Sequence, residues 1–175
     1  PALASIFKAY ERMGLVMTSA DLGLTVEEDL RKNALPVAPR CLIPLGVYEK
    51  GVPPSIVAAD GSFAGVQAMA EVLGQPLSEL SVSVQGIGEV GERASGQMLE
   101  KGASVIITEA DSETRRAFEE KHKKYLVAGK LKFLDDLDAI YDAEVDIFYP
   151  CALRDILTEQ NLERLKKAGV RMVGG

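Results

Sequence analysis

The second half of this sequence alternates short apolar runs with segments of helical periodicity. The apolar runs predict strands over residues 82–84, 104–108, 131–133, 145–149 and 170–173. The intervening segments predict helices over residues 89–101, 112–124, 136–141 and 159–168. Short apolar strands separated by helices are typical of βαβ units, whose strands lie side by side in a parallel sheet. We therefore expect an α/β fold with a doubly wound, mainly parallel sheet.

The first third of the chain is less regular. Residues 2–13 have the apolar spacing of an amphipathic helix, 15–17 resemble a short strand, and 26–33 could form one or two helical turns. Five prolines then fall between residues 33 and 54, which is typical of a loop-rich connection.

A predicted helix over residues 62–73 follows the proline-rich stretch and ends at Gly74. The change from prolines to regular helix and strand marks a domain boundary. We expect residues 1–59 to be the end of a separate domain with an interdomain crossing, and residues 60–175 to form the α/β domain.

Composition narrows the possible partners. The 175 residues carry a formal net charge of −6, and basic residues are mixed with acidic ones except at Lys121–Lys124. A nucleic-acid partner would need a basic face, so none is expected. No apolar run approaches the roughly 20 residues of a membrane helix, so no membrane partner is expected either. Cys41 and Cys151 lie far apart, which favours a reducing, cytoplasmic setting over a disulfide framework.

A glycine motif follows the predicted strand at 82–84. It reads Gly86-Ile87-Gly88-Glu89-Val90-Gly91 and opens the predicted helix at 89–101. The first glycine permits a tight turn, the second lets the backbone approach a pyrophosphate, and the third lets helix and strand pack closely. The free N–H groups at the helix start then attract phosphate. This motif in a strand–turn–helix setting predicts a Rossmann-type dinucleotide site.

Glu109 ends the next predicted strand, about 18 residues after the last glycine of the motif. A carboxylate there can accept hydrogen bonds from both hydroxyls of an adenine ribose and repels a 2′-phosphate. Glu109 therefore predicts NAD as the cofactor and disfavours NADP. Asp111 is an alternative for this role, and a solvated loop carboxylate is the simpler interpretation of Glu109.

At this point the sequence resembles the glutamate/leucine/phenylalanine/valine dehydrogenase superfamily, most nearly its leucine dehydrogenase branch. The resemblance rests on Val82-Ser83-Val84-Gln85 with the glycine motif, on Asp146-Ile147-Phe148-Tyr149-Pro150-Cys151-Ala152-Leu153, on Val173-Gly174-Gly175, and on Thr18-Ser19-Ala20-Asp21-Leu22-Gly23-Leu24-Thr25.

This resemblance implies reversible oxidative deamination of an L-amino acid to a 2-oxo acid, with hydride transfer to NAD(P). It makes Asp21 the catalytic aspartate, although a turn aspartate ahead of Gly23 is the simpler interpretation. It also makes Cys151 and Ala152 backbone contacts near the nicotinamide ribose, while a small buried core residue is the alternative for Cys151. A small-molecule amino acid or 2-oxo acid is the expected partner, and a homo-oligomer is possible.

The sequence also departs from the family. It contains no Gly-Gly-Gly-Lys run, so we expect the lysine-bearing segment to precede Pro1 and this chain alone to be inactive. The stretch 51–58 resembles the family's Gly-Asn/Asp-Pro-Ser-Pro-x-Thr-Ala loop, but Val57 replaces the threonine, whose hydroxyl in the family binds near the nicotinamide amide. Two alternatives remain: a non-catalytic NAD-binding or NAD-sensing module, and a diverged dehydrogenase acting on another oxo or imino substrate.

The remaining candidate residues suggest no further chemistry. His122 lies among lysines on a predicted helix, so we expect it on a solvated face. Two distant cysteines and one histidine have no zinc-ligand spacing, so no metal is expected.

Overall fold

The computed structural model describes residues 2–14, 32–39, 53–152 and 156–174. The chain divides into two compact units, Pro1–Pro54 and Ser55–Gly175. In the first unit α1 (Ala2–Met13) forms the helix predicted there and buries Phe7. The predicted strand at 15–17 and nearly all of the predicted turns at 26–33 lie outside the described residues.

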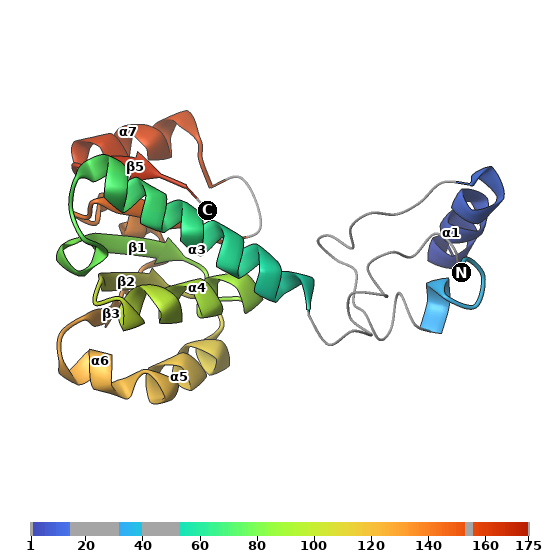
Figure 1. The fold of residues 1–175 in the computed structure, drawn as a ribbon, viewed down its shortest axis with the longest axis horizontal. Coiled ribbons are helices and arrows are strands. Elements are labelled where there is room, and N and C mark those ends of the chain that lie inside the picture. The colour runs from blue at the N-terminus through green and yellow to red at the C-terminus, as the bar shows by residue number, and fades with distance from the viewer. Residues whose placement is uncertain (1, 15–31, 40–52, 153–155, 175) are drawn as a thin grey trace. The chain divides into compact units, whose positions relative to one another are not determined.

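The second unit is built on a parallel sheet, which has five strands within the described residues (Figure 1). The strands are β1 (Ser81–Gln85), β2 (Ser104–Thr108), β3 (Leu131–Phe133), β4 (Ile147–Pro150) and β5 (Met172–Val173). Their order across the sheet is β3-β2-β1-β4-β5. The α/β fold with a parallel sheet, predicted from the alternation of strands and helices, is thus confirmed.

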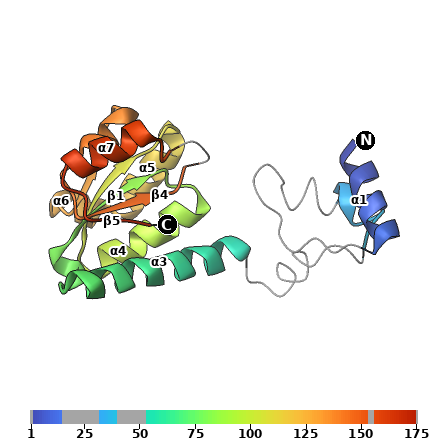
Figure 2. The ribbon, with the colours of Figure 1, turned by 90° about the horizontal axis from the view of Figure 1, so that it is seen from above.

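Helices cover both faces of this sheet (Figure 2). They are α3 (Pro54–Leu73), α4 (Glu89–Glu100), α5 (Ser112–Lys121), α6 (Lys123–Val127) and α7 (Glu159–Lys167), with 3₁₀ turns η2 (Leu77–Glu79) and η3 (Leu137–Asp142). α3 and α4 pack on one face, and η3 and α7 pack on the other.

Strand register explains how the two faces differ. Val84 lies beside Ile107 and Tyr149 in the neighbouring strands, and all three side chains belong to the core under α3 and α4. Successive strand residues point to opposite faces, so Phe148 belongs to the second core with Leu165 of α7. Side chains on both faces of the central strands are therefore buried, as in parallel sheets generally.

The sheet has a topological switch point. From β1 the chain moves outward to β2 and β3, then crosses back to β4 on the other side of β1. In open α/β sheets ligands bind beyond the carboxyl ends of the strands at such a point. The fold therefore places its candidate site at the ends of β1 and β4.

Helix α3 differs most from the prediction. It begins at Pro54, whereas the sequence predicted a start at Ser62, and the predicted domain division after residue 59 falls inside it. Proline fits the first turn of a helix because its missing N–H has no intrahelical partner there. The expectation that no apolar run approaches membrane length was also wrong, because the segment Ser55–Leu73 is, by length and composition, long and apolar enough to cross a membrane. Phe63, Val66 and Ala70 are buried in the core beneath it, which makes α3 a covering helix of this domain.

Smaller differences concern the ends of elements. The helix predicted over 112–124 is interrupted at His122, and the strands predicted from 145 and 170 begin at Ile147 and Met172. Before β4, Asp146 uses its carboxylate to accept hydrogen bonds from the Ser81 backbone N–H and hydroxyl, at 2.8 and 2.9 Å. The residue before β4 thus holds the start of the neighbouring strand β1 with its side chain.

Candidate functional site

A cavity of about 420 Å³ opens at the carboxyl ends of β1, β2 and β4. Its lining combines the glycine loop after β1, the ends of β1 and β2, the start of α5, Leu137 of η3, and the segment after β4. Cofactor pockets in proteins typically have volumes of about 300–1,000 Å³, so this cavity is of suitable size. It lies at the switch point of the sheet.

The glycine motif shapes one wall of this cavity. Gly86 has a φ of +88°, and its N–H donates to the carbonyl of Thr108 at 2.9 Å. A Cβ at Gly91 would lie 2.2 Å from the carbonyl oxygen of Gly86, so only glycine fits there. A Cβ at Gly88 would meet no heavy atom within 4 Å. The backbone conformation at Gly86 and the close packing at Gly91 thus require glycine, whereas a side chain at Gly88 would extend into open space.

Helix α4 begins at this loop and presents its amino terminus to the cavity. Its N-cap residue is Gly88, and no side chain caps it. The first N–H groups of a helix have no intrahelical acceptor and carry the positive end of the helix dipole. Glu89 and Val90 form the first turn, exposed and half-buried respectively. This end of α4 can therefore bind an anionic group through backbone N–H donors.

Glu109 stands at the end of β2 and lines the cavity. One carboxylate oxygen accepts a hydrogen bond from the Ile87 N–H at 2.8 Å, and the other accepts from the Asp111 N–H at 2.9 Å. Each oxygen keeps further lone pairs, because an ionised carboxylate offers about four acceptor positions. Glu109 is therefore fixed in place and can still accept hydrogen bonds from a ligand.

Asp111, the alternative to Glu109, is engaged elsewhere. It is the N-cap of α5, and its carboxylate accepts a hydrogen bond from the Thr114 N–H at 2.7 Å. That bond lowers the pKa of Asp111. Since Asp111 is not among the residues that line the cavity, the geometry favours Glu109 as the ligand-facing carboxylate.

Cys151 and Ala152 follow β4 on the opposite side of the cavity. The Cys151 N–H donates to the Gln85 carbonyl at 2.9 Å, which extends the ladder between β1 and β4. A Cβ at Gly86 would lie 3.3 Å from the Ala152 backbone, so the two loops touch closely. Burial raises the pKa of the Cys151 thiol to about 11, so the thiol stays protonated near neutral pH. This segment offers backbone groups to a ligand and no thiolate nucleophile.

The structure thus brings half of the ten predicted site residues to one cavity. Gly86, Gly88, Glu109, Cys151 and Ala152 line it. The side chain of Ile87 is buried, and its N–H holds Glu109. Asp21, the predicted catalytic aspartate, lies outside the described residues.

The sequence analysis missed five further lining residues: Gln85, Thr108, Ala110, Thr114 and Leu137. Gln85 and Thr108 are the last residues of β1 and β2, so their place at the ligand-binding end of a parallel sheet was readable from the strand predictions. Thr108 is 2% exposed, and its hydroxyl oxygen has no hydrogen-bond partner among the described residues. Leu137 comes from η3, and nothing local in the sequence indicated it.

The expectation for His122 was wrong. Its side chain is only 8% exposed, and its ring centroid lies 4.2 Å from that of Phe118. A Cβ at Gly96 of α4 would lie 3.3 Å from the imidazole, so that glycine makes room for the ring. The lysines around His122 do point to solvent, but the helix is interrupted at this residue and the ring turns inward. Among the described residues no group of His, Cys, Asp and Glu side chains could hold a metal ion.

Comparison with known proteins gives concordant matches. A family model described as Glutamate/Leucine/Phenylalanine/Valine dehydrogenase matches residues 56–174. Phenylalanine dehydrogenase of Caldalkalibacillus thermarum is 35% identical over 118 residues, covering 66% of this chain and 31% of that protein. Leucine dehydrogenase of Thermoactinomyces intermedius is 32% identical over 161 residues, covering 87% and 40%.

A solved structure agrees at the level of the fold. L-tryptophan dehydrogenase from Nostoc punctiforme aligns with a TM-score of 0.69 at 21% identity, covering 98% of this chain and 46% of that one. The chain spans less than half the length of the relatives it matches. Because the family model covers well over half of its residues, the chain belongs to the glutamate/leucine/phenylalanine/valine dehydrogenase family.

Proposed function

We propose that this chain is the NAD-binding part of a dehydrogenase that oxidatively deaminates an L-amino acid to a 2-oxo acid. The observation that carries the proposal is the open space at Gly88 beside the fixed carboxylate of Glu109, within one cavity. The chain's family membership supports the reaction class.

The residues present fit a dinucleotide. The backbone at Gly88 leaves room for a pyrophosphate at close range, because none of the residues that the structure describes fills the space that a Cβ would take. The uncapped start of α4 supplies donors for its negative charge. The remaining lone pairs of Glu109 are acceptors for which a ribose hydroxyl is a suitable partner.

NAD is proposed over NADP because of Glu109. Ribose hydroxyls donate readily to a carboxylate, whereas a 2′-phosphate would meet like charge. Repulsion between unit charges at about 4 Å is about 1 kcal/mol in water and about 4 kcal/mol at an effective dielectric of 20. Bound NAD would supply the hydride acceptor, with its nicotinamide half on the side of Cys151 and Ala152.

Asp21 is proposed as the proton-transferring aspartate because its segment matches the family's. The protein is proposed to act in the cytoplasm.

A second candidate function, an NAD-binding module without catalysis, is favoured by Val57. This residue lies in α3, is 57% exposed, and carries no hydroxyl to bind a nicotinamide amide.

An NADH assay separates these functions. The 175-residue chain and its full-length natural gene product are each mixed with NAD and a panel of L-amino acids, and NADH absorbance is followed. We expect NADH from the natural product and none from the 175 residues, which contain no Gly-Gly-Gly-Lys run. NADH from neither protein, with NAD binding intact, would favour the non-catalytic module. NADH from the 175-residue chain would show that another residue activates the water.

A further inference from the structure

Gln85 occupies the middle of the candidate site. It is the last residue of β1, and its backbone lies between Thr108 at the end of β2 and Pro150 at the end of β4. Gln85 is one of the residues that line the cavity. Glu109, which is proposed to bind the adenine ribose, lies on one side of Gln85, and the segment after β4 lies on the other. Gln85 is therefore placed near the middle of a dinucleotide that spans the cavity.

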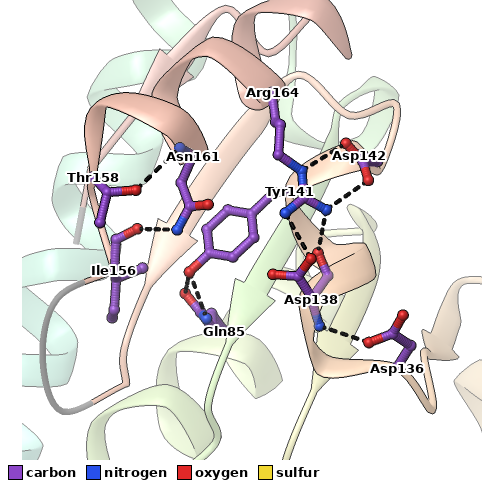
Figure 3. A network of polar contacts seen from close by, with 9 residues as sticks. All are labelled: Gln85, Asp136, Asp138, Tyr141, Asp142, Ile156, Thr158, Asn161 and Arg164. Atoms are coloured by element: carbon purple, nitrogen blue, oxygen red, sulfur yellow. Dashed lines mark hydrogen bonds and ion pairs between the residues drawn. The ribbon is translucent and has the colours of Figure 1, made fainter.

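The side-chain amide of Gln85 is held by Tyr141. Its Nε2 donates to the tyrosine hydroxyl at 2.9 Å, and the hydroxyl donates to its Oε1 at 3.2 Å (Figure 3). A glutamine amide has two N–H donors and an oxygen with two lone pairs. These two bonds therefore leave one N–H and one lone pair, and no other partner of the amide is found in the described part of the chain.

Tyr141 is itself fixed by a polar clamp. Its ring is 5% exposed in η3, and the Arg164 guanidinium of α7 lies 5.3 Å from the ring centroid. Arg164 makes two hydrogen bonds to the Asp142 carboxylate at 3.0 and 2.6 Å, and one to the Asp138 carboxylate at 2.7 Å (Figure 3). These bonds raise the pKa of Arg164. Both aspartates belong to η3, so the guanidinium fixes the turn that carries the tyrosine.

We propose that Gln85 contacts the central part of the dinucleotide and that Tyr141 is the residue that positions it. The remaining N–H of the amide would donate to an oxygen of the nicotinamide-side phosphate or of the ribose joined to that phosphate. Without the tyrosine hydroxyl the amide loses both of its bonds, and binding must order it again. The inference rests on the proposed NAD-binding function.

The experiment measures NAD, ADP-ribose and AMP binding to Tyr141→Phe by calorimetry. We expect Kd for NAD and ADP-ribose to rise about three- to tenfold, the size of one net hydrogen bond, while Kd for AMP is unchanged. ADP-ribose keeps the pyrophosphate and both riboses, whereas AMP ends at the adenosine-side phosphate and lacks the second phosphate and the second ribose. Tyr125→Phe makes the same chemical change in α6, outside the cavity lining, and should leave all three values unchanged.

A double-mutant cycle tests whether the tyrosine acts through the glutamine. Gln85→Met should weaken NAD about as much as Tyr141→Phe, and the double variant should lose no more than either single variant, since both remove one interaction. If Tyr141→Phe fails to fold, Gln85→Met alone still tests the contact. An unchanged Kd in either variant, additive losses, or equal weakening of AMP would overturn the inference. If the parent chain binds no NAD, the proposed function itself fails and the inference falls with it.

Discussion

Gly91→Ala is the substitution whose cost the structure defines best. The added Cβ would lie 2.2 Å from the Gly86 carbonyl oxygen and 3.2 Å from both the Gly86 carbonyl carbon and the Cys151 Cβ. Carbon atoms in good contact are about 3.5–4.0 Å apart, so the new atom would be well inside the repulsive range. The nearest obstacle is backbone in a loop that also bonds to Thr108, and it cannot move aside as a long side chain would.

Forced overpacking of a close-packed site costs about 1–3 kcal/mol. With a urea m-value of about 2 kcal/mol/M, a loss of about 2 kcal/mol lowers the unfolding midpoint by about 1 M. Urea titration followed by far-ultraviolet circular dichroism measures this shift directly. The slope of the transition should stay unchanged, because the substitution alters packing and leaves the surface exposed on unfolding almost the same.

Gly61→Ala is the matched control. It adds the same methyl group to an exposed position inside α3, where a Cβ meets no heavy atom within 4 Å. Alanine is favoured over glycine in helix interiors by up to about 1 kcal/mol, so this midpoint should rise slightly. A Gly91→Ala midpoint equal to that of the parent, alongside the expected shift for Gly61→Ala, would refute the close approach of helix and strand.

Three further predictions concern the cofactor and the core. Glu109→Ala should weaken NAD binding by about tenfold or more and relax the discrimination against NADP, because charge-assisted hydrogen bonds contribute about 1.5–3 kcal/mol each. Titration of the parent and the variant with NAD and with NADP measures both effects, and an unchanged NAD affinity would mean that another group holds the ribose. Gly88→Val should abolish NAD binding with native circular dichroism, since its methyl groups enter open space and φ there is −63°; normal affinity in a folded variant would contradict the close approach of the pyrophosphate to Gly88. Burial lowers the pKa of His122 in the folded state below 6.5. As pH falls, the unfolded chain therefore takes up the proton first, and the stability present above pH 6.5 is lost as pH approaches the folded-state pKa. The urea unfolding midpoint should therefore fall as pH falls in the parent chain, and it should fall less in His122→Gln. The same dependence of the midpoint on pH in both proteins would refute the assignment.

The sequence predicted what depends on local pattern. Apolar runs placed β1 to β4, and the glycine spacing placed the turn after β1, because backbone conformation and strand burial leave a local signature. The end of β2 then put Glu109 at the correct edge of the sheet. Each of these features involves residues close together along the chain.

The misses involve contacts distant in sequence. Gln85 and Tyr141 are 56 positions apart, and neither has a local pattern that indicates the other. His122 turns inward because Gly96 of α4 leaves room for it, which no helical periodicity around the histidine reveals. The early start of α3 at Pro54 has a different cause: prolines read as loop residues, although a helix accepts one in its first turn.

The proposed function requires this chain to hold NAD between the glycine loop and Glu109. This requirement can be tested by calorimetric titration of the purified 175-residue chain with NAD and, separately, with NADP. We expect saturable binding of NAD, with NADP weaker by about tenfold or more, as loss of charge-assisted hydrogen bonds to the ribose requires. An absence of NAD binding by the folded chain, or equal affinity for NAD and NADP, would contradict it.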